Sequence, residues 1–188
     1  MNIFYLSNDV QKCAEMHVDK HCVKMILEYA QLLSTAHRYL DGTPYIGHSA
    51  SGRKKTIYRL SDDYHDASLY AATHINHPSA RWVRQSPENY NWLANMLLAL
   101  CEEYTHRYGK IHKVEREGLC YILYKNMPHN IGNRGFTQPT PAMPDDVKIS
   151  GDSIASYKNY YIKNKGHLAS WKKRNIPEWY NANICVSR

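Results

Sequence analysis

The sequence lacks the features that mark membrane, secreted and thiolate-metal proteins. Its 188 residues contain no apolar run near the ~18 residues that a transmembrane helix needs, and the first ten have no basic region of the kind that begins a signal peptide. The five cysteines are scattered, odd in number and nowhere form C-x-x-C, which argues against a disulfide framework or a thiolate zinc site. These absences predict a cytoplasmic protein that uses neither a metal nor another cofactor.

Phenylalanine is also scarce, with 2 residues against 16 tyrosines and 4 tryptophans. Acidic residues are outnumbered, since 24 Lys and Arg stand against 17 Asp and Glu, and the formal net charge is +7. Residues 148–188 hold +6 of this excess, interleaved with Tyr and Trp. A basic, Tyr-rich surface suits phosphates and stacked bases, so this segment favours contact with DNA or a small phosphate-containing nucleotide. A solvated helix with its aromatic side chains packed inward is the alternative.

Helical spacing and capping residues predict a mainly α fold, a compact helical bundle with long loops that forms a single domain over residues 1–188. Asn8 and Gln11 resemble a capping box, and Ser86-Pro87 opens the clearest later helix, which Gly109 ends. MNIFYL at the start reads as a short strand or an extended lead-in. The expected helices span 9–40 (with a break near Val18), 61–73, 87–108, 112–125 and 152–165; loops span 42–56 and 126–148, and a basic, aromatic tail follows the last helix.

A polar stripe marks the first long helix. At 100° per residue its polar side chains fall in one band about 100° wide, on a helix that is otherwise apolar. Titratable groups of mixed type favour a stripe that lines a cleft over a plain solvent face. Glu28 is its only carboxylate and a candidate general base, although it also has the spacing of an ordinary ion pair with Lys24. The stripe consists of His17, His21, Lys24, Glu28, Gln31, Thr35 and Arg38.

Two further segments carry candidate binding residues. In HPSARWVR, residues 77–84, the side chains of His77, Arg81, Trp82 and Arg84 could face the same cleft, although a helix start with Trp82 in the core explains the run equally well. The loop at 129–139 has the composition of a ligand-covering loop, in which Arg134 can meet a phosphate and Phe136 is a further candidate for binding the substrate. An ordinary surface loop would have the same composition. His17 and His21 have the spacing of metal ligands, but no outer carboxylate completes a recognisable metal motif.

Three short runs together resemble a family of small phage proteins: DKHCVKMILE at 19–28, NHP at 76–78 and NYNWL at 89–93. More distantly, Asp19-x-His21 followed by Glu28 resembles the phage pyrimidine-dimer DNA glycosylase/AP lyase of the endonuclease V type. That resemblance implies a phage-encoded protein in an infected bacterium, a compact helical domain, and an N-terminal amine that attacks the sugar C1′ to form an imine. Glu28 would match the assisting glutamate, and His21 the histidine that helps to hold the DNA.

The sequence departs from that enzyme in two places. The enzyme exposes its amine by removing the initiator Met before a small residue, whereas Asn2 should leave Met1 in place. Either the amine of Met1 acts, or this chemistry is absent. Its glutamate also lies among arginines, whereas only Lys24 is close to Glu28 on the helix.

Two functions therefore remain open: a DNA glycosylase/AP lyase-like base-excision enzyme, or a phage anti-defence protein that sequesters or cleaves a small nucleotide immune signal. Asn2 and the single carboxylate favour the second, and the basic tail favours the first. A homo-oligomer is compatible with either.

Overall fold

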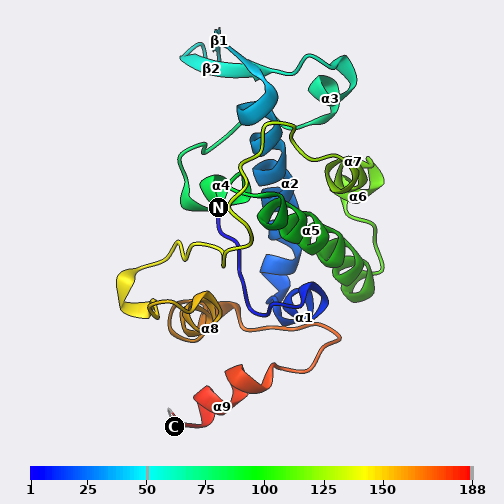
Figure 1. The fold of residues 1–188 in the computed structure, drawn as a ribbon. Helices are drawn as coiled ribbons and strands as arrows, with labels where there is room; N and C mark the ends of the chain where they lie inside the picture. The colour runs from blue at the N-terminus through cyan, green and yellow to red at the C-terminus, as the bar shows by residue number, and fades with distance from the viewer. Residues whose placement is uncertain (50, 187–188) are drawn as a thin grey trace.

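The long helix α2, Asp19–Asp41, runs through the centre of the molecule (Figure 1). The computed structural model describes residues 1–49 and 51–186, with side chains as far as residue 182. Helix α2 packs against α5 (Pro87–Tyr108), α4 (Pro78–Val83) and α7 (Leu119–Lys125). Helix α1, Val10–Met16, packs on α5. This mainly helical body confirms the predicted fold class. In the part of the chain that is described, no helix has the length and apolar character needed to cross a membrane.

The helix ends follow their capping residues. Ser86 Oγ accepts a hydrogen bond from the Asn89 amide, and α5 ends at Gly109 in the left-handed conformation, as predicted. The predicted break near Val18 in the helical segment 9–40 is present, because His17 and Val18 have extended backbone that separates α1 from α2. The prediction of Asn8 as the cap is wrong: the Asp9 side chain accepts the bond from the Lys12 amide.

The predicted loop at 42–56 is instead a β-hairpin. Strands β1 (Thr43–His48) and β2 (Lys54–Arg59) pair antiparallel, and Gly52 has a left-handed φ in the turn that joins them. The turn-forming Gly and Ser residues suggested a loop, whereas the β-branched and aromatic residues of both strands carried the missed signal. The predicted helix 61–73 is also too long, since α3 covers only Asp63–Ser68.

The second half of the chain is more broken than predicted. Residues 112–125 form two helices, α6 (Lys113–Arg116) and α7, because Gly118 takes a left-handed φ between them. Residues 126–148 are irregular apart from the 3₁₀ turn Asp145–Val147. Helix α8, Ser153–Asn164, follows its predicted position, and the tail contains a 3₁₀ turn at Gly166–Leu168 and an unpredicted helix α9, Glu178–Val186.

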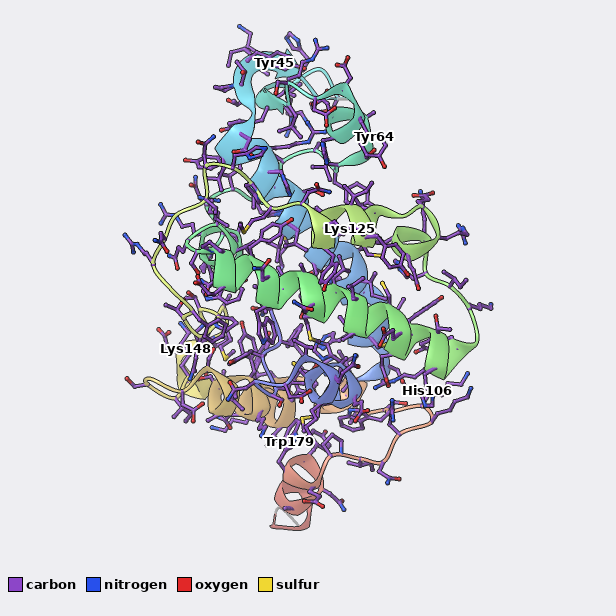
Figure 2. All side chains as sticks on the ribbon, turned by 45° about the vertical axis from the view of Figure 1, so that its right-hand side comes forward. Tyr45, Tyr64, His106, Lys125, Lys148 and Trp179 are labelled. Atoms are coloured by element: carbon purple, nitrogen blue, oxygen red, sulfur yellow. The ribbon has the colours of Figure 1, made fainter. Side chains whose placement is uncertain are left out.

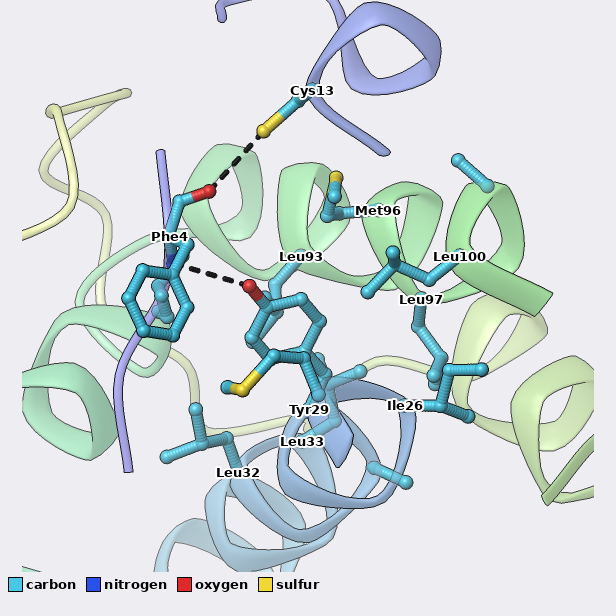
Figure 3. Close-up of a cluster of buried hydrophobic side chains, with 14 of the residues drawn as sticks. Phe4, Cys13, Ile26, Tyr29, Leu32, Leu33, Leu93, Met96, Leu97 and Leu100 are labelled. Carbon is cyan, nitrogen blue, oxygen red and sulfur yellow. Dashed lines mark hydrogen bonds between the residues drawn. The ribbon is translucent and has the colours of Figure 1, made fainter. Parts of the chain in front are cut away.

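The first six residues lie in the core rather than in a sheet. Ile3 through Leu6 are buried, and Figure 3 shows Phe4 beside α1, α2 and α5. The backbone here is held by side chains: the Phe4 amide donates to Tyr29 Oη (3.2 Å), and the Cys13 thiol donates to the Phe4 carbonyl oxygen (3.3 Å). The N-terminus therefore has a position that the core determines.

The aromatic side chains of the C-terminal segment pack inward. Tyr157 and Tyr161 of α8 are buried against the Phe4 ring, and Trp171 donates its indole N–H to the Met16 carbonyl oxygen. Arg174 pairs with the Glu103 carboxylate at 2.8 Å. These residues are used within the protein, which is the alternative that the sequence left open for the tail.

Candidate active site

The α-amino group of Met1 lies beside the carboxylate of Glu28. The distance from the Met1 nitrogen to Glu28 Oε2 is 3.9 Å, and the two side chains are only 5% and 13% exposed. The other carboxylate oxygen, Oε1, lies 3.1 Å from Lys24 Nζ, four residues earlier on α2. One carboxylate thus stands between two amines, which is an arrangement suited to proton transfer and to covalent chemistry on a carbonyl-like carbon.

Asn2 fixes the amine in this place. Its Nδ2 donates to the Ala142 carbonyl oxygen and its Oδ1 accepts from the Tyr157 hydroxyl, both at 2.9 Å. The next four residues are buried in the core. An amine held from two sides needs little further ordering before it reacts, which is how positioning lowers a barrier. Sequence reasoning missed Asn2 as an anchor, because its partners lie 140 and 155 residues away.

His77 is the N-cap residue of α4. Its Nδ1 caps α4 by accepting the Ser79 amide at 3.2 Å, which leaves Nε2 for other partners. Burial lowers the pKa of His77, the nearby N-terminal amine lowers it further, and Glu28 raises it. His77 is therefore neutral at neutral pH. We call the Met1 amine, Glu28 and Lys24 the amine site.

Three members of the predicted stripe lie elsewhere. His17 is fully buried, with Nδ1 2.7 Å from the Cys13 carbonyl oxygen, and Thr35 is buried with its hydroxyl bonded to the backbone of Thr73. Arg38 uses its guanidinium on four carbonyl oxygens and the Asp66 carboxylate, at 2.6 to 2.8 Å. None of these side chains is accessible to a substrate, so the prediction that they bind one has no support in the structure. Gln31, one turn beyond Glu28, is half-buried.

His21 lies beneath the N-terminal segment. Its ring stacks on Phe4 with centroids 4.1 Å apart, and Nδ1 is 2.8 Å from the Tyr161 hydroxyl. Burial lowers the pKa of His21 to about 3, so the ring carries no charge that would hold a phosphate at neutral pH. The expectation that His21 contacts DNA directly is therefore not supported. His21 instead packs against Phe4, which holds the backbone that leads to the amine.

Three arginines gather beside α4. Arg81, Arg84 and Arg134 line an open hollow of about 610 Å³, together with Asn130 and Gly132 of the long loop. Arg81 and Arg134 are exposed, whereas Arg84 donates to the Ile75 carbonyl oxygen and lies over the Tyr39 ring at 4.2 Å. We call this the arginine hollow. Its planar cations are the groups that bind phosphate well.

The long loop is held against α4 and α5 by hydrogen bonds at Thr137. Trp82 is buried and donates its indole N–H to the Thr137 carbonyl oxygen, as expected of a core anchor. Asn89 fastens the same residue, accepting the Thr137 amide at 2.9 Å. Phe136 contacts the Trp82 ring yet stays 45% exposed. Phe136 and Arg134 therefore lie on the surface beside α4, whereas Trp82 lies in the core.

A metal centre has no geometric basis in the described part of the chain. No cluster of three His, Cys, Asp or Glu side chains there is arranged to hold an ion. His17 and His21, the pair with ligand spacing, direct their Nδ1 atoms to the Cys13 carbonyl oxygen and the Tyr161 hydroxyl respectively.

Comparison with known proteins identifies the family. A model of the pyrimidine dimer DNA glycosylase family matches residues 1–116. No curated protein and no solved structure matches the chain. The matched region contains the amine site as well as Arg81 and Arg84, whereas the partners of Asn2 and the long loop lie beyond it. Because the match covers more than half of the sequence, the chain belongs to this family.

Proposed function

We propose that this member of the pyrimidine dimer DNA glycosylase family is a DNA glycosylase with lyase activity, in which the α-amine of Met1 is the nucleophile and Glu28 the acid–base residue. Family membership suggests the repair activity and a DNA substrate. The observation that carries the assignment of residues is the 3.9 Å approach of the Met1 nitrogen to the Glu28 carboxylate, in a place where both are shielded from solvent.

The chemistry follows from these two groups. The neutral amine attacks the sugar C1′, and the base leaves with the electron pair of the glycosidic bond and takes up a proton. The nitrogen then loses a proton and C1′–O4′ opens, giving an imine whose ring oxygen is protonated; Glu28 is placed to transfer these protons. Removal of a proton from C2′ of the imine expels the 3′ phosphate and breaks the strand.

Neighbouring residues support this scheme. Lys24 holds one oxygen of Glu28 and places a cation near the phosphate that departs. His77, uncharged at neutral pH, is suited to accept a proton from the amine. The arginine hollow would bind phosphates flanking the target, with Phe136 offering a face to an unstacked base.

The nucleotide-binding anti-defence alternative draws only on the arginine hollow, whose size and charge also suit a small nucleotide. It gives no role to the buried amine. Neither that alternative nor phage origin follows from family membership, and both remain proposals from the sequence.

Borohydride trapping tests the assignment. Duplex DNA with a single abasic site should give a covalent adduct, and digestion should place the added mass on the peptide that begins with Met1. Glu28→Gln should lower single-turnover cleavage by about 10²-fold or more, whereas Lys24→Gln should keep the adduct on Met1. An adduct on Lys24, or full activity of a chain whose N-terminus is blocked, would overturn the assignment of the nucleophile. Nucleotide released on denaturation of the purified protein, without any trapped adduct, would favour the alternative.

A further inference from the structure

The β1–β2 hairpin projects from the helical body at the end of α2 (Figure 1). Figure 2 shows Tyr45 of β1 at one end of the molecule and Trp179 of the tail at the other. Most of the described strand residues of the hairpin are exposed, including Ile46 at 68% and Tyr45 at 48%. A two-stranded hairpin is only marginally stable by itself. A hairpin that projects into solvent therefore depends on contacts with the rest of the protein.

The charged side chains of the hairpin are all positive. Residues 43–59 contain Arg53, Lys54, Lys55 and Arg59 and not one Asp or Glu. Arg59, at the base, lies 3.7 Å from Asp63. Within the described residues, the three cations at the outer end have no carboxylate within 4.0 Å, and all three are exposed. Unpaired cations beside exposed aromatic and aliphatic side chains complement a polyanion with apolar sugar surfaces, such as duplex DNA.

The anchor is the buried guanidinium of Arg38. It donates to the Tyr58 carbonyl oxygen of β2 at 2.8 Å and to the Asp66 carboxylate at 2.7 Å. Gly42 closes the join, because a Cβ there would lie 2.4 Å from the Arg38 carbonyl oxygen. The base of the hairpin is thus fixed to α2, the helix that carries Glu28.

Helix α2 connects the hairpin to the amine site. Glu28 and Tyr39 lie on the same face of α2, because eleven residues at 100° each come within 20° of three full turns. They are separated by about 16 Å along the axis. The Tyr39 ring contacts the Tyr58 ring of β2, with centroids 5.7 Å apart, and carries the guanidinium of Arg84 on its face. Arg84 in turn follows α4, which begins at His77.

We propose that the β1–β2 hairpin is a DNA-binding arm that holds the duplex on one side of the target nucleotide. Arg53, Lys54 and Lys55 bind backbone phosphates, and Tyr45 and Ile46 pack against the sugar edge of a groove. Strands of six residues extend about 20 Å. Added to the 16 Å along α2, the arm reaches about 5–10 base pairs from the amine at 3.4 Å per pair. The inference rests on the proposed function for its substrate, but not for its geometry.

A charge-neutral triple variant, Arg53→Gln, Lys54→Gln and Lys55→Gln, tests the arm. For a 30-base-pair abasic duplex, we expect its Kd to rise at least about tenfold at 0.1 M salt and its log–log salt slope to fall by about 2.7. Hydroxyl-radical protection should shorten on one flank only. Borohydride trapping at saturating protein should remain at the wild-type level, because the amine site is untouched. The matched control replaces three exposed cations outside the hairpin, Lys110, Lys113 and Arg116, by Gln and should leave the one-sided protection unchanged.

The outcomes separate the arm from the catalytic assignment. Unchanged affinity and salt slope in the triple variant, with normal trapping by the wild type, would overturn the arm and leave the proposed function intact. Loss of affinity in the triple variant, with no trapping by the wild type, would support the arm and overturn the function. A change in oligomeric state without a change in DNA affinity would identify the hairpin as a contact between copies and also overturn the arm.

Discussion

The position of the N-terminal amine beside Glu28 provides the sharpest test of the proposed nucleophile. Asn2 anchors the amine through two hydrogen bonds of 2.9 Å, to the Ala142 carbonyl oxygen and from the Tyr157 hydroxyl. Asn2→Leu keeps a large second residue, and hence Met1, but removes both bonds. At about 0.5–1.5 kcal/mol each, their loss should lower the free energy of unfolding by roughly 1–3 kcal/mol. The freed amine should react more slowly, since a displacement near 1 Å costs about 10²-fold.

Asn2→Ala removes the same bonds and, in addition, the initiator Met, because the second residue is then small. The amine now belongs to residue 2, about 3.5 Å further along the chain from its place beside Glu28. We expect borohydride trapping to fall well below that of Asn2→Leu. A chain with one alanine inserted between Met1 and Asn2 is the matched control: Met1 is removed, but the new amine occupies the original register and Asn2 stays anchored. That chain should trap abasic DNA at close to the wild-type rate.

Intact mass and single-turnover trapping at pH 7.5 measure the series, with urea unfolding as the check on stability. Trapping rates should be highest for the wild type and the insertion, lower for Asn2→Leu and lowest for Asn2→Ala. Wild-type trapping by a fully processed Asn2→Ala chain would refute it, because the amine beside Glu28 would then be dispensable.

Three further predictions concern stability and the loop. Arg107 is fully buried with its Nε 2.6 Å from Glu103 Oε1, so Arg107→Met should lower the free energy of unfolding by about 3–5 kcal/mol in urea titrations; a loss below 1 kcal/mol would contradict this. Burial lowers the pKa of His17 to about 4 and that of His21 to about 3 from the usual 6.5. The unfolded chain therefore binds protons that the folded chain does not as pH falls from about 6.5 toward 4, and stability should drop over that window by roughly 3 kcal/mol for His17 alone. Urea midpoints at pH 7.5 and 5 check it, and pH-independent midpoints would refute it. Gly132→Ala places a Cβ 2.6 Å from a backbone carbonyl oxygen, so the loop must shift; DNA affinity should fall while trapping at saturating protein stays normal, and an unchanged Kd would argue against a loop role.

Local signals in the sequence predicted much of the helical framework, because caps and stops act within one turn. Ser86 and Gly109 bound α5 as expected, and Asp41 ends α2. The hairpin differs from the predicted loop because its strands are mostly exposed apart from the contact of β2 with α2, so the alternation of buried and exposed residues that marks a strand is weak. Gly118, which has a left-handed φ and splits the predicted helix 112–125, is a local signal for a break in that helix.

The candidate site was predictable in part. Glu28 lies beside the Met1 amine and pairs with Lys24, and the predicted stripe places both residues on one face of the helix. The two histidines of the same stripe, His17 and His21, do not belong to the site. Helical spacing places side chains on one face of a helix but does not predict which other segments cover that face. The first six residues and α8 cover His17 and His21, through contacts such as that of His21 with Tyr161, 140 residues away. Tertiary partners at such separations leave no local trace.

The distribution of charge shows the same limit. The sequence places nearly all of the excess in residues 148–188, yet there Arg174 pairs with Glu103 and Glu15, and Lys173 donates to the His106 carbonyl oxygen. The smaller group at 53–55 stands exposed on a hairpin that is fixed to α2, the helix that carries Glu28. A cation without a carboxylate partner is free to bind a polyanion, and within the described residues the run at 53–55 offers three of them on a projecting element.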